Sequence, residues 1–293
     1  MAKDDPGDIT GLIETFQRNE ITEHYIYLKL AEKEKDLHNR DVLKRIAGEE
    51  LHHYEAFRKL SGRDFEPDRR KISWYSVMAR IFGLTFTIKL MEKGESRAQS
   101  GYSEIKENYP GINSIIADEE RHELELANMI NEEKLGYMGS VVLGLNDALV
   151  ELTGALAGFS FALQNTALIG SIGLITGIAA AMSMAASEYL SEKADGVGEK
   201  DPFRAASYTG GAYIMTVFLL ILPYFIFNKY AVALAVAIIT GIIIIFVFNF
   251  YISVAKDLDF KRRFLEMAAI SLGVAGLSFL LGVAVRIVFG VDI

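Results

Sequence analysis

Two short motifs in the first half of the chain pair a carboxylate with an imidazole. Glu49-Glu50-Leu51-His52 and Glu119-Glu120-Arg121-His122 each contain the pattern Glu-x-x-His. Residues three apart lie on the same face of a helix, so each pair could hold one metal ion. The chain has no cysteine, which leaves carboxylates and imidazoles as its strong metal ligands. These motifs therefore predict coordination of a metal ion by oxygen and nitrogen.

A matching element precedes each motif: Glu20-x-x-Glu23-x-x-x-Tyr27 before the first and Glu95-x-x-Ala98-x-x-x-Tyr102 before the second. Helical bundles that bind two iron or manganese ions take a Glu from each of two helices and a Glu-x-x-His from each of the other two. The domain is thus interpreted as a duplicated helical hairpin with a two-ion site. Glu23 and Glu92 lie within a turn of Glu20 and Glu95 and are candidates for alternative or additional ligands.

The residues next to these motifs are given other roles. Glu50 and His53 point to another side of their helix, and we expect them at the surface. His24 is expected to pack beside the site and His38 to lie in a loop. A single Glu-x-x-His on a charged helix most often lies on a face exposed to solvent. Two such motifs, each preceded by a matching Glu and Tyr, argue against coincidence.

The elements that must position these residues are helices. Apolar residues recur at helical spacing over roughly 9–35, 40–60, 74–106 and 113–133. The breaks between them contain Gly or Pro, at Ser61-Gly62-Arg63, Glu66-Pro67 and Tyr109-Pro110-Gly111. The pattern predicts an all-α fold whose first domain, residues 1–136, is a four-helix bundle.

These residues resemble the rubrerythrin-like branch of the ferritin-like superfamily, over residues 9–133. The resemblance implies a diiron site at six residues, with Tyr27 and Tyr102 as hydrogen-bond partners of the ligands. The six are Glu20, Glu49, His52, Glu95, Glu119 and His122. Rubredoxin-type cysteines are missing, which argues against a peroxidase fed by an attached electron-transfer centre.

The second domain, residues 137–293, has a different composition. Five stretches of about twenty residues carry almost no charge, and each is long enough to span a bilayer as a helix. They cover roughly 139–163, 167–190, 205–227, 231–254 and 267–288. We therefore predict a five-helix transmembrane domain embedded in a lipid bilayer.

Basic residues predict the orientation of these spans. They collect in two alternate loops, one with Lys193, Lys200 and Arg204 and the other with Lys256, Lys261, Arg262 and Arg263. Positively charged loops stay on the cytosolic side. The first domain is then cytosolic and Ile293 lies outside. No signal peptide is recognised at the start, and we expect a prokaryotic inner membrane.

Charged residues within spans are costly and point to function. Asp147 and Glu151 lie one turn apart in the first span, as a candidate cation site. Met182, Met184 and Glu188 follow in the second span. A thioether is a soft ligand that suits ferrous iron better than calcium or magnesium, although methionines also fill cores.

The strings Gly144-Leu145-Asn146-Asp147 and Ser183-Met184-Ala185-Ala186-Ser187-Glu188 resemble the vacuolar iron transporter family, over residues 137–293. The resemblance implies a five-span homodimer that exchanges Fe²⁺ or Mn²⁺ for protons through Asp147 and Met184. Ser187 stands where the family usually has Gly, and the loop 192–204 is too short for the cytosolic helical domain of plant-type members. The fusion of the two domains is similar to membrane-bound ferritins of bacteria and archaea, which implies export of iron or manganese.

Three functions follow from these observations. The first is a divalent metal transporter whose cytosolic domain captures, senses or oxidises iron. The second is a membrane-anchored diiron oxidase or peroxidase, for which one span would suffice. The third, an iron store, lacks an obvious way to assemble a closed shell. The net charge of −8 suits cations and gives no support for nucleic-acid binding.

Overall fold

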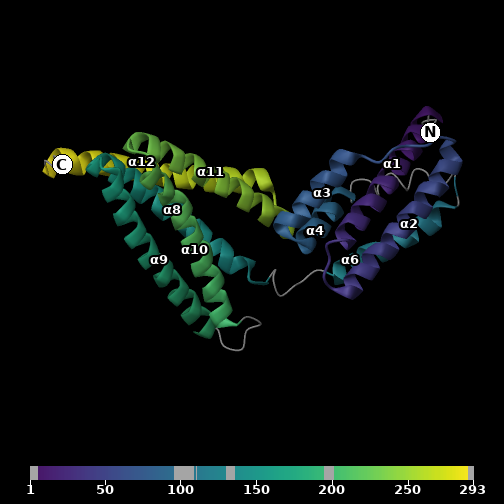
Figure 1. The fold of residues 1–293 in the computed structure, drawn as a ribbon, viewed down its shortest axis with the longest axis horizontal. Helices are drawn as coiled ribbons and strands as arrows, with labels where there is room; N and C mark the ends of the chain where they lie inside the picture. The colour runs from purple at the N-terminus through teal and green to yellow at the C-terminus, as the bar shows by residue number, and fades with distance from the viewer. Residues whose placement is uncertain (1–5, 96–108, 110, 130–135, 195–200, 290–293) are drawn as a thin grey trace, which may run out of the picture. The chain divides into compact units, whose positions relative to one another are not determined.

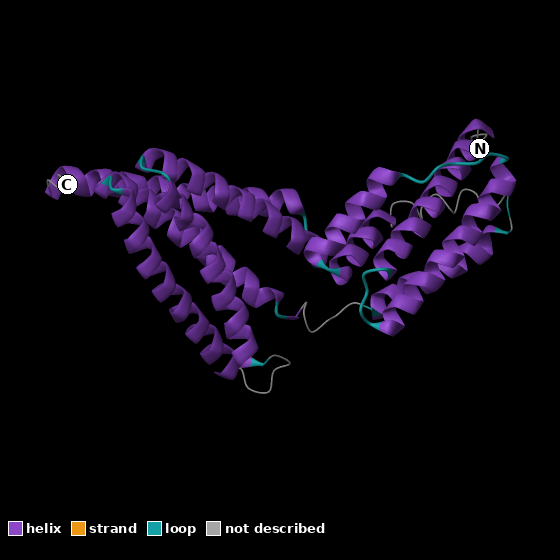
Figure 2. Cartoon of the chain, in the orientation of Figure 1, coloured by secondary structure: helices purple, strands orange, loops and turns teal. Residues whose placement is uncertain are grey.

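A computed structural model describes residues 6–95, 109, 111–129, 136–194 and 201–289. The chain divides into two compact units, Met1–Asn131 and Glu132–Ile293. Within the described residues every regular element is a helix (Figures 1 and 2). The all-α expectation is confirmed for this part of the chain.

The first unit contains α1 (Pro6–Ala31), α2 (Leu37–Ser61), α3 (Arg69–Phe82), α4 (Leu84–Glu95) and α6 (Ile112–Asn128). α1 and α2 form the most extensive pair, and α1 also packs against α3. Asp36 caps the start of α2 by accepting a hydrogen bond from the Asn39 amide, and Gly62 ends the same helix with a left-handed φ of 67°.

The predicted single helix over 74–106 is wrong in its first part. It is interrupted at Gly83, whose φ of 88° lies in the left-handed region that favours glycine. The chain therefore forms two helices, α3 and α4, that pack against each other. Residues 96–108, the rest of the predicted helix, lie outside the described part of the chain.

Two apolar layers form the core of the first unit. One contains Ile13 and Phe16 of α1, Phe57 of α2, and Ile112 and Ile115 of α6. The other contains buried residues of α1, α2, α4 and α6: Ile26, Tyr27, Leu30, Leu43, Ile46, Ala47, Ile88, Met91 and Leu126. Between the two layers, α1, α2 and α6 contribute a group of buried polar residues: Gln17, Glu20, Thr22, Glu50, His53 and His122. The polar layer is therefore flanked by apolar packing on both sides.

The second unit contains α8 (Met138–Leu163), α9 (Thr166–Ala194), α10 (Pro202–Ile226), α11 (Tyr230–Ala255) and α12 (Phe260–Phe289). All five are long and apolar enough to cross a membrane, which confirms the five predicted spans. α8 packs against each of the other four. The unit is therefore built around its first span.

Gly144 allows α8 to approach α10 closely. A Cβ atom at this position would lie 2.1 Å from the backbone oxygen of Thr209. The Thr209 hydroxyl donates a hydrogen bond to the backbone oxygen of Ser140 at 3.0 Å across the same contact. The absence of a side chain at Gly144 thus sets the distance between these two spans.

Candidate metal centre

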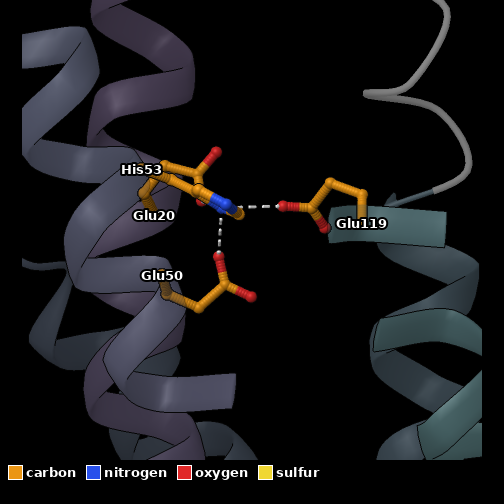
Figure 3. Close-up of side chains that lie close together, drawn as sticks. All are labelled: Glu20, Glu50, His53 and Glu119. Atoms are coloured by element: carbon orange, nitrogen blue, oxygen red, sulfur yellow. Dashed lines mark ion pairs between the residues drawn. The ribbon is translucent and has the colours of Figure 1, made fainter. Parts of the chain in front are cut away.

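The polar layer of the first unit holds the candidate metal centre. Four residues from three helices meet there: Glu20 of α1, Glu50 and His53 of α2, and Glu119 of α6 (Figure 3). One ligand atom from each lies within 4.8 Å of those of the other three. Glu20, Glu50 and His53 are almost fully buried. Side chains that usually face water have thus been gathered in the core.

His53 lies at the centre of this group. Its Nδ1 atom is 3.2 Å from Glu119 Oε1, 3.4 Å from Glu50 Oε2 and 3.6 Å from Glu20 Oε2. The contacts to Glu50 and Glu119 are drawn in Figure 3. Three carboxylates around one imidazole nitrogen form a compact donor set of the kind that binds a divalent metal.

The expectation that Glu50 and His53 lie at the surface is wrong. They are the inward Glu-x-x-His pair of α2, whereas His52 is exposed and bonds through Nδ1 to the Gly48 carbonyl at 2.8 Å. The reason is helical phase, because a shift of one residue turns a side chain by about 100°. The buried positions of α2 are Leu43, Ile46, Ala47, Glu50, His53, Tyr54 and Phe57. Glu50 and His53 continue that stripe, and Glu49 and His52 do not.

His122 of α6, the histidine of the second motif, extends the group. It is buried, and its Nδ1 atom lies 3.2 Å from Glu50 Oε1. Glu50 therefore presents one carboxylate oxygen to His53 and the other to His122. This is the arrangement expected of a carboxylate that bridges two positions.

Two outer carboxylates hold the far nitrogens of the histidines. Glu49 Oε2 lies 2.7 Å from His122 Nε2, and Asp118 Oδ2 lies 3.4 Å from His53 Nε2. Arg121 contacts both carboxylates, at 3.2 Å to Glu49 Oε1 and 2.7 Å to Asp118 Oδ1. A carboxylate on the outer nitrogen fixes the tautomer and orientation of a ligating histidine. Both imidazoles are therefore oriented with Nδ1 inward.

Burial and mutual repulsion shape the acidity of the group. Burial raises the pKa of Glu20 well above its ordinary value, and the neighbouring charges of Glu50 and Glu119 add to the rise. Burial also raises the pKa of Glu119. For Glu50, burial opposes ionisation, but short contacts with His122 and His53 outweigh it and lower the pKa to about 2.

The histidines respond in the opposite sense. Burial acts to lower the pKa of His53, yet the surrounding carboxylates prevail and raise it above the ordinary 6.5. The pKa of His122 is raised in the same way, mainly by Glu50. The imidazoles and the buried acids thus stabilise each other's charged forms, and a bound metal cation can stabilise the acids in the same way.

The donor atoms fit a metal ion. Four of them are buried without a hydrogen-bond partner: Glu50 Oε2, His53 Nδ1, Glu119 Oε1 and His122 Nδ1. Buried polar atoms are rarely left without partners. Ligands at about 2.1 Å from one ion can be at most about 4.2 Å apart. The ligand atoms of Glu20, Glu50, His53 and Glu119 lie within 4.8 Å of one another, so these side chains need only move slightly inward to bind one ion.

The remaining predicted residues of the first unit lie in different surroundings. Glu23 is half-buried, and its pKa is raised well above the ordinary value by burial and by the charges of Glu50 and Glu20. Glu92 is half-buried and lies 3.9 Å from Lys89. Tyr27 is buried in an apolar layer. Tyr102 and the side chain of Glu95 lie outside the described part of the structure.

In the second unit, two of the predicted carboxylates accept short hydrogen bonds from other spans. Tyr213 of α10, which is fully buried, donates to Glu151 Oε2 at 2.6 Å. Ser140 of α8 donates to Glu188 Oε1 at 2.6 Å. Both carboxylates are therefore held in place by neutral donors.

The other predicted pathway residues face different ways. Asp147 is half-buried, one turn before Glu151 on α8. Met184 is half-buried against the apolar core of the unit, whereas 67% of Met182 is exposed. Met184 therefore packs inside the unit, and Met182 points away from it.

Sequence reasoning did not identify several residues of the two sites. The burial of Glu50 and His53 could have been inferred from the stripe that runs from Leu43 to Phe57. Asp118, Arg121 and Tyr213 had no comparable signal, because each acts on a residue of another helix: Asp118 on His53, Arg121 on Glu49 and Tyr213 on Glu151.

Comparison with known proteins adds one match. Residues 138–196 match the sequence model of the VIT family. The match covers α8 and α9, including Asp147, Glu151, Met182, Met184 and Glu188. No curated protein matches the chain. The match supports a membrane protein that handles metal ions and does not extend to the first unit.

Proposed function

We propose that the protein transports a divalent metal, Fe²⁺ or Mn²⁺, across a membrane, and that its first unit binds the same metal at the buried cluster. The observation that carries transport is the match to the VIT family, because it covers the two spans with the intramembrane carboxylates. Five apolar helices exceed the needs of an anchor. We propose exchange for protons, export from the cytosol and a homodimer as the working form.

The first unit would hold two metal ions. Glu20, Glu50, His53, Glu119 and His122 would hold them, with Glu50 between the two histidines. Iron and manganese suit these oxygen and nitrogen donors. Glu95 would supply a further carboxylate. Glu49, placed in this site by the sequence, would instead orient His122 from outside.

The chain's residues would divide the work between capture and passage. The buried acids attract and desolvate the cation, and the histidines release protons as it binds. In the second unit Asp147 and Glu151 would offer oxygens to the passing ion, with Tyr213 steadying Glu151. A bound iron pair would also supply oxygen chemistry, which keeps a membrane-anchored diiron oxidase as the second candidate.

Flux of Fe²⁺ and Mn²⁺ into proteoliposomes tests the proposal. We expect transport by the full chain, loss of flux in Asp147→Ala, and continued though altered flux in His53→Ala. Glu266→Gln is the matched control, because this carboxylate lies on α12 in an exposed pair with Arg262 at 2.9 Å. No flux from any variant, together with Fe²⁺-dependent oxygen consumption that is lost in His53→Ala, would establish the anchored oxidase instead.

A further inference from the structure

The outward face of α3 carries an apolar stripe. Trp74, Val77 and Ile81 are 51%, 47% and 63% exposed. Their spacing of three and four residues puts them on one side of the helix. The opposite side is occupied, since Ile72, Tyr75 and Ala79 pack against the apolar layer of the first unit. α3 therefore has a packed apolar face and a second one that no described residue covers.

Basic residues surround this stripe. α3 has the sequence RRKISWYSVMARIF, with Arg69, Arg70, Lys71 and Arg80 and no acidic residue. Arg70 lies one turn before Trp74 on the same line of the helix. The chain as a whole is acidic, with a net charge of −8. The basic residues of α3 thus give a positive charge to the region around the apolar stripe, although the whole chain is acidic.

We propose that this face of α3 docks on the surface of an anionic lipid bilayer. Helices that lie in a membrane interface combine Trp and aliphatic residues on one face with Lys or Arg beside them. The long basic side chains can place their stems in the interface and their charges among lipid phosphates. Aromatic residues such as Trp74 favour this depth.

Connectivity supports a lipid surface as the partner. The chain runs from this unit into one with five helices that can span a membrane, so a bilayer is always nearby. A second copy pairing through the same face would bring basic residues against basic residues. Charge complementarity therefore favours anionic lipid over self-association. The proposal does not depend on metal transport.

Trp74 makes the proposal directly measurable, because it is the only tryptophan in the chain. The full-length protein would be placed in nanodiscs, with one copy or two per disc, made of phosphatidylcholine or of an equal mixture with phosphatidylglycerol. Brominated acyl chains and aqueous iodide would then compete as quenchers of Trp74 fluorescence. We expect quenching by the brominated chains and protection from iodide in the anionic discs, with the effect reduced by salt.

Variants separate the contributions of charge and apolar area. Replacing Arg69, Arg70 and Arg80 with Gln should weaken docking by about fivefold for each charge removed. Ile81→Glu should abolish quenching by the brominated chains. Leu37→Glu is the matched control, since Leu37 is 66% exposed on α2 and should leave the signal unchanged. Far-ultraviolet circular dichroism checks that each variant keeps its helices.

Two results would overturn the proposal. One is a Trp74 signal that iodide quenches equally in both lipids while brominated chains have no effect. The other is protection that appears only when two copies share a disc, which would assign the face to a second copy of the chain.

Discussion

The two units surround their carboxylates with different groups. In the first, charged donor atoms of Glu50, Glu119, His53 and His122 lie 3.2 to 3.4 Å from one another, and no neutral group holds these atoms by a hydrogen bond. In the second, Glu151 and Glu188 are each held by a hydroxyl from another span, at 2.6 Å. Donor atoms that converge without neutral partners favour tight binding of a cation. Acids that already have a neutral partner bind one more weakly, as a transport path requires.

The substitution with the largest expected effect on one unit alone is His53→Ala, which should weaken metal binding by the first unit. It removes the nitrogen around which three carboxylates gather, and we expect metal affinity of the first unit to fall by at least about 100-fold. Metal content of the purified full chain, by mass spectrometry, is the measurement. His52→Ala is the control, because His52 is exposed one residue away. Loss of metal in the control alone would show that Glu49 and His52 are the ligands of α2, in place of Glu50 and His53.

Gly144→Ala should damage the second unit without affecting the first. The added methyl meets the Thr209 carbonyl, and overpacking of this kind costs about 1–3 kcal/mol. Thermal unfolding of the detergent-solubilised protein would show the loss. Gly273→Ala on α12 is the matched control and should keep its stability, since nothing lies within 4 Å of a Cβ atom at that position. Equal stability of the two variants would contradict the close contact of α8 and α10.

Arg121→Gln tests whether the outer carboxylates matter in the first unit. The substitution frees Glu49 and Asp118, which hold the outer nitrogens of both histidines. We expect metal affinity to fall by about tenfold, measured by competition with a chelator. Arg63→Gln, which breaks a surface contact to Glu14, should have no effect on affinity. An unchanged affinity in Arg121→Gln would limit this residue to a surface role.

The smallest effect should come from Tyr213→Phe. It removes the hydrogen bond to Glu151 and should cost about 1 kcal/mol of unfolding free energy, with a measurable change in metal flux. Tyr224→Phe on the same helix removes a comparable bond to Ser160, at 2.7 Å, and should change stability alone. If both variants alter flux alike, the bond to Glu151 has no special part in the pathway.

Much of the fold could be predicted from the sequence. Long uncharged stretches leave little choice but spanning helices, and all five were placed. The break at Gly83 is not predicted, because glycine occurs within helices as well as at positions of positive φ. The arrangement of the first unit as a ferritin-like bundle stays a prediction.

The sequence predicts a cluster of carboxylates and histidines in the first unit, and the structure contains one. Glu20, Glu119 and His122 lie in or beside the polar layer, and their role as metal ligands stays a prediction. Two overlapping Glu-x-x-His pairs on α2 differ only in helical phase, and the apolar residues around them decide which pair turns inward. The contact of Arg121 with Glu49 depends on how α2 and α6 pack, which local sequence does not specify.

The layered core has an evolutionary consequence. Each apolar layer takes residues from α1, α2 and α6, so the helices stay joined on both sides of the polar layer. A replacement such as Glu119→Leu removes a buried acid and should raise the stability of the metal-free protein while it weakens metal binding. Random drift toward a more stable fold would therefore erase the cluster, and only selection for the bound ion would oppose that drift.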